Sequence, residues 1–95
     1  MSAGGAECRE RLEIQNRLGL HARAAVLLVQ TASRFEAEVL IQKDGQTVSG
    51  RSIMGVMTLA ATQGSTIEVT TSGPQAAEAL EAIRALVAAK FNEPN

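Results

Sequence analysis

Residues 37–49 read AEVLIQKDGQTVS, and this stretch decides the fold. Over residues 37–43, apolar and polar residues alternate, which is the period-two pattern of a half-buried strand. The dipeptide Asp44-Gly45 follows, and it is typical of a tight hairpin turn. Residues 46–49 can then return as a short strand. The two strands joined by this turn must therefore run antiparallel in one sheet.

On the N-terminal side of this hairpin, the sequence predicts a strand and then a helix. Residues 11–15 alternate between apolar and polar, as a half-buried strand does. Residues 16–20 contain a glycine and indicate a loop. From residue 22, small and apolar residues recur at i, i+3, i+4 and i+7, which marks one face of a helix. We expect that helix to end near residue 33 or 34.

On the C-terminal side, a short helix, a strand and a long helix are expected. Residues 52–60 suit a short helix, and residues 66–70 alternate as a last strand. Gly73-Pro74 should end that strand, because proline suits the first turn of a helix. One apolar stripe then continues to the end of the chain through Ala76, Leu80, Ile83, Val87 and Phe91.

The expected order of elements is therefore β-α-β-β-α-β-α. Each helix is apolar on one stripe only, so the economical fold is a four-stranded antiparallel sheet with three helices on one face. This is an α+β, open-faced architecture that leaves the other sheet face largely to solvent. With 95 residues, the chain suits one domain, over residues 8–95, after a flexible extension at residues 1–7.

Composition excludes several classes of function. The net charge is −1 and the sequence pI is about 5.8, so the chain lacks the basic footprint of a nucleic-acid-binding protein. Two Phe, with no Tyr or Trp, also argue against stacking on bases. The single cysteine, Cys8, cannot form an internal disulfide or a metal cluster. No apolar run approaches the ~20 residues that span a bilayer, so we expect a cytoplasmic protein without membrane insertion or cofactor.

His21 is the only histidine, and its position suggests phosphate chemistry. It lies between the glycine-containing loop and the helix that begins at about Ala22. A helix N-terminus presents unpaired backbone N–H groups, here around Ala22 and Ala24, and these favour a bound or attached phosphate. The same field disfavours the imidazolium, and a neutral imidazole has the lone pair needed to attack phosphorus.

Arg23, in the first helical turn, can supply charge-assisted hydrogen bonds to phosphate oxygens. No Asp or Glu is close in sequence to orient the imidazole of His21. The residues alone also suit a surface or capping histidine beside a solvated arginine. The sequence has no glycine-rich nucleotide loop, so any phosphoryl donor must come from a partner.

Ser52 is expected to be the N-cap of the short helix. So short a helix cannot direct all of its large apolar side chains inward, namely those of Ile53, Met54, Val56 and Met57. Some of them can form an exposed docking patch, which methionine suits because its side chain is adaptable. Ordinary core packing and simple capping are the alternatives for these residues.

These segments together resemble the HPr family, the histidine-containing phosphocarriers of bacterial phosphotransferase systems. Residues 16–23, NRLGLHAR, resemble its active-site motif, and residues 52–57, SIMGVM, resemble its second motif, which opens with a regulatory serine. The resemblance runs from about Arg9 to Phe91. The family motif usually has proline where Ala24 stands. The change restores a backbone N–H and keeps helix propensity, so we expect the site to survive with a looser entry.

The resemblance implies an open-faced β-sandwich and a phosphocarrier, with no enzymatic activity of its own. It implies that His21 receives a phosphoryl group on Nδ1 from phospho-Enzyme I, which draws it from phosphoenolpyruvate, and passes it to an Enzyme II A component. It further implies that Ser52 is the target of an HPr kinase/phosphorylase in some lineages. Ile53, Met54 and Met57 would then dock on partners.

Two branches of the family remain open. Residues 13–19 and the segment 67–75 look like the nitrogen-related branch, which signals through its phosphorylation state. The Ser52 motif looks instead like the sugar-branch HPr of Gram-positive bacteria. The alternative function is therefore a regulatory phosphoprotein that acts by docking to other proteins.

Overall fold

The computed structural model describes residues 6–93 of the chain. Its elements are β1 (Ala6–Glu13), α1 (Ala22–Ala32), β2 (Glu38–Lys43), β3 (Gln46–Ser49), α2 (Ile53–Thr58), β4 (Thr66–Gly73), α3 (Ala76–Ala88) and a final short turn of helix, η1 (Lys90–Asn92). The predicted order of strands and main helices is confirmed. Every helix within the described residues is too short or too polar to span a bilayer.

The N-terminal strand starts earlier than the sequence predicted. β1 begins at Ala6, and its residues pair with β4 from Ala6↔Gly73 onward. Residues 6 and 7, which we expected in a flexible extension, therefore lie in the sheet. The rest of that predicted extension, residues 1–5, lies outside the described residues.

The four strands form one antiparallel sheet in the order β1-β4-β2-β3. The predicted hairpin is confirmed, with Lys43 paired to Gln46 across the turn. Asp44 and Gly45 have positive φ angles of 51° and 84°, as both central residues of a type I′ turn require. This turn matches the twist of the strands that it joins, so the local sequence alone specifies the hairpin.

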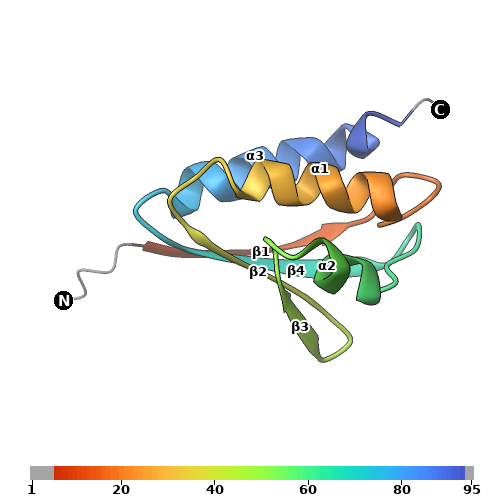
Figure 1. Cartoon of the computed structure of the whole chain (residues 1–95), viewed down its shortest axis with the longest axis horizontal. Helices are drawn as coiled ribbons and strands as arrows, with labels where there is room; N and C mark the ends of the chain where they lie inside the picture. Colours follow the sequence, from red (N-terminus) through yellow and green to blue (C-terminus); the bar gives the residue numbers. More distant parts are fainter. Residues whose placement is uncertain (1–5, 94–95) are drawn as a thin grey trace.

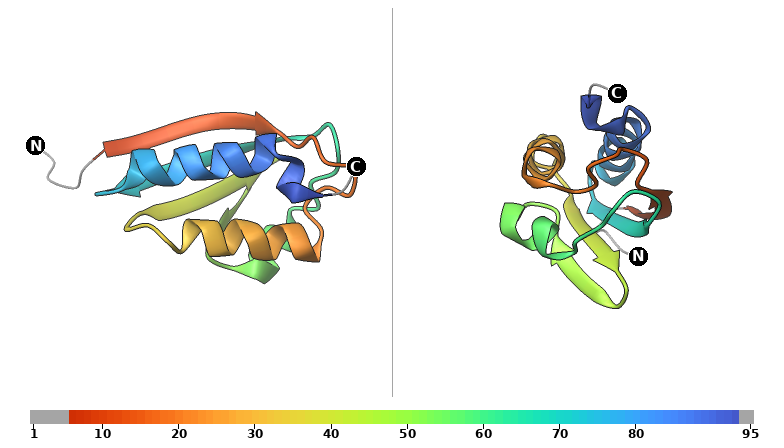
Figure 2. Two further views of the ribbon diagram at one scale, coloured as in Figure 1. Left: turned by 90° about the horizontal axis from the view of Figure 1, so that it is seen from above. Right: turned by 90° about the vertical axis from the view of Figure 1, so that its right-hand side faces the viewer.

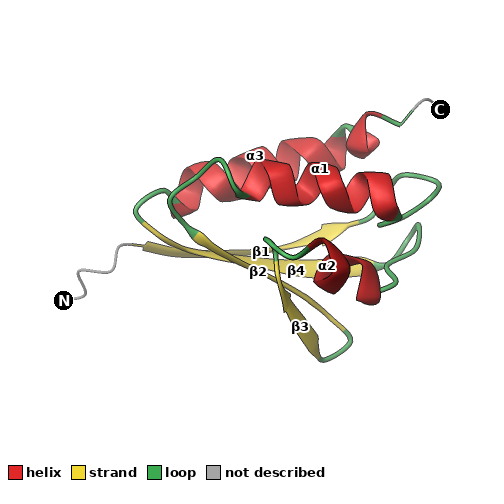
Figure 3. Ribbon diagram, viewed as in Figure 1, coloured by secondary structure: helices red, strands yellow, loops and turns green. Residues whose placement is uncertain are grey.

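The helices cover one face of this sheet, as the α+β prediction requires. α1 and α3 lie side by side above the strands, and α2 packs against α1 and β3 (Figures 1 and 2). Figure 3 shows the two layers, helices against strands. The core lies between the layers and is fully buried at its centre, through Ile14, Leu28, Val39, Ile41, Ile67, Val69 and Ile83. α1 and α3 thus pack on the sheet through this buried core.

The C-terminal helix departs from the predicted single stripe. α3 ends at Ala88, and Lys90, Phe91 and Asn92 then adopt positive φ angles of 56°, 54° and 57°. Phe91 is nevertheless buried, as expected, because this left-handed turn directs its ring back into the core. The apolar stripe of α3 therefore stays buried as far as Phe91, although the chain is no longer α-helical there.

An ion pair fastens α3 to the edge strand β1. The Nε of Arg84 donates to Oε1 of Glu10 over 2.9 Å. This hydrogen bond from the guanidinium lowers the pKa of the Glu10 carboxyl below its usual value. Because the folded state lowers that pKa, the pair contributes stability at neutral pH, and the contribution is lost as the pH falls through the lowered pKa of Glu10.

Candidate functional site

His21 is the N-cap residue of α1. Its backbone is extended, and its carbonyl accepts the first helical hydrogen bond, from the N–H of Ala25 over 2.8 Å. Its imidazole makes no capping hydrogen bond, and the side chain is 29% exposed. The ring is therefore not used to cap the helix and is accessible at the helix N-terminus, where backbone N–H groups favour a phosphate.

Glu93 lies against this ring, although it comes from the opposite end of the chain. Its Oε2 is 3.2 Å from Nε2 of His21, and its side chain is only 14% exposed. A carboxylate at this distance favours a proton on Nε2. In the neutral ring, a proton on Nε2 leaves Nδ1 with the free lone pair. Glu93 lies far from His21 along the chain, so local sequence context did not reveal this acidic partner.

The left-handed turn after α3 brings Glu93 to His21. Such turns usually have glycine at the first positive-φ position, whereas this chain has Lys90 followed by Phe91 and Asn92. Non-glycine residues in this region are strained, and burial of Phe91 offsets that strain. Figure 2 shows the end of α3 turning toward the start of α1. The C-terminal segment is thus placed by packing rather than by a turn motif.

The loop that precedes His21, between β1 and α1, is held tightly in place. Gly19 has a φ of +67°, and a Cβ added to it would lie 2.3 Å from the carbonyl oxygen of Ala61. The next residue, Leu20, donates its N–H to the same oxygen over 2.9 Å. Only glycine allows this approach, so the loop between β1 and α1 is held against the loop before β4.

Asn16, the first residue of the motif NRLGLHAR, connects this loop to Glu93, a role that its sequence context did not indicate. Its Nδ2 donates to the carbonyl of Gly19 over 2.9 Å and to Oε2 of Glu93 over 3.4 Å. The backbone N–H of Leu18 also points to Oε1 of the same carboxylate, over 3.5 Å. Asn16 is 1% exposed. His21, Glu93 and Asn16 therefore form one connected group.

The structure places the predicted first-turn residues at the start of α1, directly after His21. Ala22 and Arg23 are exposed, and Ala24 is fully buried against the core. Within residues 6–93, the guanidinium of Arg23 forms no ion pair, so it is available to an incoming anion. The burial of Ala24 shows that the small side chain at this position is used in packing, while its N–H stays in the first turn.

Further positive charge lies next to Glu93. A pocket of about 370 Å³ is lined by Gln15, Arg17, Gln63, Lys90 and Glu93. Arg17 and Lys90 are both exposed and come from the two ends of the chain. Neither was predicted as a site residue, because their proximity depends on the fold. The surroundings of His21 therefore combine one carboxylate with several cations.

Ser52 directly precedes α2, the helix that packs against α1 (Figure 1), and its apolar neighbours lie on that helix. Ser52 is the N-cap, and its Oγ accepts the N–H of Gly55 over 2.9 Å. Ile53, Met54 and Met57 are exposed, Met54 by 71%, whereas Val56 is fully buried. We call these three exposed side chains the α2 patch. Leu18, in the loop before His21, is 62% exposed and was not predicted to be so.

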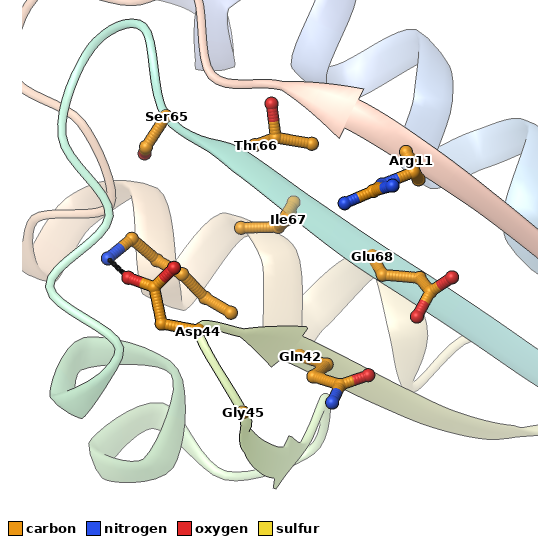
Figure 4. A pocket seen from close by; sticks show the side chains of 9 residues that line it. Arg11, Gln42, Asp44, Gly45, Ser65, Thr66, Ile67 and Glu68 are labelled. Atoms are coloured by element: carbon orange, nitrogen blue, oxygen red, sulfur yellow. Dashed lines mark hydrogen bonds and ion pairs between the residues drawn. The ribbon is translucent and has the colours of Figure 1, made fainter.

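A second pocket lies away from these residues. It has a volume of about 560 Å³ and opens between the β2–β3 turn and the start of β4 (Figure 4). Its charges are of both signs, and Lys43 pairs with Asp44 over 2.8 Å. It contains none of the predicted site residues. No group of three potential metal-ligating side chains occurs among residues 6–93.

Comparison with known proteins identifies the family of this chain. The family model described as the PTS HPr component phosphorylation site matches residues 8–89. The chain is 47% identical to the phosphocarrier protein HPr of Neisseria meningitidis serogroup A over 85 residues, which cover 90% of this chain and 96% of that protein. It is 46% identical over 78 residues to the HPr-like protein Crh of Halalkalibacterium halodurans, covering 82% and 93% of the two chains.

Solved structures show the same fold. The crystal structure of the phosphocarrier protein HPr from Bacillus anthracis superposes with a TM-score of 0.83 at 49% identity and covers 87% of this chain and 99% of that one. The similarity therefore extends beyond the two short motifs and over most of the described residues. The chain belongs to the HPr family of phosphocarrier components of the phosphotransferase system.

Proposed function

We propose that this chain accepts a phosphoryl group on Nδ1 of His21 from phospho-Enzyme I and passes it to an Enzyme II A component. The observation that carries the proposal is the position of His21 at the N-terminus of α1 with Nε2 against the Glu93 carboxylate. Membership of the HPr family supports the carrier role. A cytoplasmic location is part of the same proposal.

The chemistry follows from this arrangement. The Nδ1 lone pair attacks phosphorus, and the bond between phosphorus and the donor breaks, with its electron pair returning to the donor. The proton on Nε2 stays in place beside Glu93. The first-turn N–H groups and Arg23 meet the phosphate oxygens, which carry the charge. Transfer to the acceptor reverses the same step with a second partner.

The test is incubation of the full chain with Enzyme I and phosphoenolpyruvate. We expect one phosphoryl group per chain, in an acid-labile and base-stable linkage as a phosphohistidine gives, and its release on addition of an Enzyme II A component. A chain that takes up no phosphate from phospho-Enzyme I would contradict the proposal.

Arg23→Ala is expected to slow phosphotransfer by about 10- to 100-fold, because a hydrogen bond to a charged group contributes about 1.5–3 kcal/mol. The melting temperature should hardly change, since Arg23 is exposed and within residues 6–93 forms no ion pair. Rapid-quench transfer rates and thermal melts measure the two effects. Arg34→Ala, an exposed arginine beyond the other end of α1, is the matched control and should transfer at the wild-type rate. A large drop in melting temperature with normal transfer would make Arg23 structural.

The α2 patch favours a second function, regulation through docking. We propose that Ile53, Met54 and Met57 contact Enzyme I and that phosphorylation of Ser52 by an HPr kinase/phosphorylase weakens this contact. A phosphate adds about −1.5 to −2 charge near neutral pH. At the N-cap of α2 that charge is locally favourable, but at an apolar docking surface it must be desolvated on binding. Stability and partner affinity should therefore change in opposite directions.

Ser52→Asp is expected to fold normally, to bind Enzyme I about tenfold more weakly, and to accept phosphate at His21 more slowly. Ser52→Asn is the control, because it is also a good N-cap and has nearly the same shape without the charge. Binding titrations and transfer rates with Enzyme I measure the effect. If the Asp and Asn variants both bind as the wild type does, Ser52 serves only as a helix cap.

A further inference from the structure

The side chain of Asn16 is buried in a position that folding alone does not favour. It is 1% exposed, and its Oδ1 is buried without a hydrogen-bond partner within residues 6–93. A buried polar atom left in this state destabilises the folded chain. The other half of the amide is fully used, since Nδ2 reaches the Gly19 carbonyl and the Glu93 carboxylate. The benefit of this amide therefore lies in its donor.

The surroundings fix the orientation of that amide. Both atoms that face Nδ2, the Gly19 carbonyl oxygen and Oε2 of Glu93, are acceptors. Turning the amide over would set Oδ1 against two acceptors, so only the present orientation is satisfied. A carboxylate at position 16 has the same shape but no hydrogen to donate. Position 16 thus requires a hydrogen-bond donor between the Gly19 carbonyl and the Glu93 carboxylate.

The same Oε2 atom of Glu93 lies 3.2 Å from Nε2 of His21. Asn16 therefore contacts the acceptor that selects which ring nitrogen carries the proton. Asn16 and Glu93 are 77 positions apart, and their contact joins the loop before α1 to the segment after α3. Its second hydrogen bond, to Gly19, holds the loop that leads into His21.

We propose that Asn16 is a positioning residue for phosphotransfer: its side-chain amide holds the Glu93 carboxylate on Nε2 of His21 and so keeps Nδ1 free as the nucleophile. The inference rests on the proposed function of His21. Asn16 does not touch the phosphoryl group and acts through Glu93. Loss of the donor should release the carboxylate, let the ring proton move between its two nitrogens, and lower the fraction of rings ready to react.

The test compares Asn16→Asp with the wild type in two measurements. In ¹⁵N NMR of the imidazole, which comes from the only histidine in the chain, the neutral wild-type ring should carry its proton on Nε2. In Asn16→Asp, two carboxylates face each other, so the proton should shift toward Nδ1. Transfer from phospho-Enzyme I should slow about fivefold or more, within the range of coupling between contacting residues. Gln30→Glu makes the same amide-to-carboxylate change at an exposed position near the other end of α1 and should leave both readouts unchanged.

A double variant distinguishes loss of the contact between Asn16 and Glu93 from a general folding defect. In the double variant Asn16→Asp/Glu93→Gln, an amide and a carboxylate again face each other with their places exchanged. Adding Asn16→Asp to Glu93→Gln should therefore slow transfer less than adding it to the wild type.

The outcomes separate the two proposals. If the wild type itself takes up no phosphate, the proposed function fails. If the wild type is phosphorylated and Asn16→Asp keeps its tautomer and its rate, the role of Asn16 is wrong. Slower transfer with an unchanged tautomer, or an equal effect of Asn16→Asp in both backgrounds, would likewise overturn it.

Discussion

His21→Ala is expected to accept no phosphoryl group from phospho-Enzyme I and to fold as the wild type does. The loss should be complete because the chain has no second histidine to act as nucleophile. The fold should persist because the His21 ring makes no capping hydrogen bond and is partly exposed. Phosphate incorporation and a thermal melt on the same sample measure the two effects. Acid-labile label on a folded His21→Ala chain would show that another residue accepts the phosphate.

Gly19→Ala is expected to lower the free energy of unfolding by about 2–4 kcal/mol, which corresponds to a drop in melting temperature of about 10–30 °C. Two costs add. A non-glycine residue at a φ of +67° is strained, and its Cβ would lie 2.3 Å from the Ala61 carbonyl oxygen. Because that oxygen also anchors Leu20, the loop must move, and phosphotransfer at His21 should fall with it.

Gly64→Ala separates these two costs. Gly64 also has a positive φ, of +91°, but no atom lies within 4 Å of the Cβ that it would gain. Gly64→Ala should therefore lose only the stability that the strained φ costs, without a steric clash, and should transfer phosphate normally. Chemical denaturation of both variants measures the difference. Equal losses in the two variants would contradict the close approach of Gly19 to Ala61.

The sequence predicted the parts of the fold that depend on local chemistry. The Asp44-Gly45 turn was identified because a type I′ turn needs residues that tolerate positive φ. The start of α1 and the cap at Ser52 were also found, because both depend on residues a few positions apart. Strand ends were less accurate, since pairing with a neighbour extends β4 to Gly73, past the alternating residues.

The site was predicted only in part, because some of its residues lie far apart along the chain. His21, Arg23 and Ser52 could be selected from local context and from motif resemblance. Asn16 stands in the quoted motif, but neither its role nor that of Glu93 could be predicted, because their contact joins residues 77 positions apart. It also depends on a left-handed turn at Lys90 that has no glycine to signal it. Burial of Phe91 sets that turn, and the sequence showed only that Phe91 is apolar.

The most direct test of the central claim is ¹⁵N NMR of the imidazole after phosphorylation by Enzyme I and phosphoenolpyruvate. Because His21 is the only histidine, the spectrum reports on one ring without assignment. We predict a phosphorus–nitrogen coupling at Nδ1, with the proton retained on Nε2 beside Glu93. Phosphate on Nε2, or an imidazole spectrum unchanged in a chain that carries phosphate elsewhere, would contradict the account.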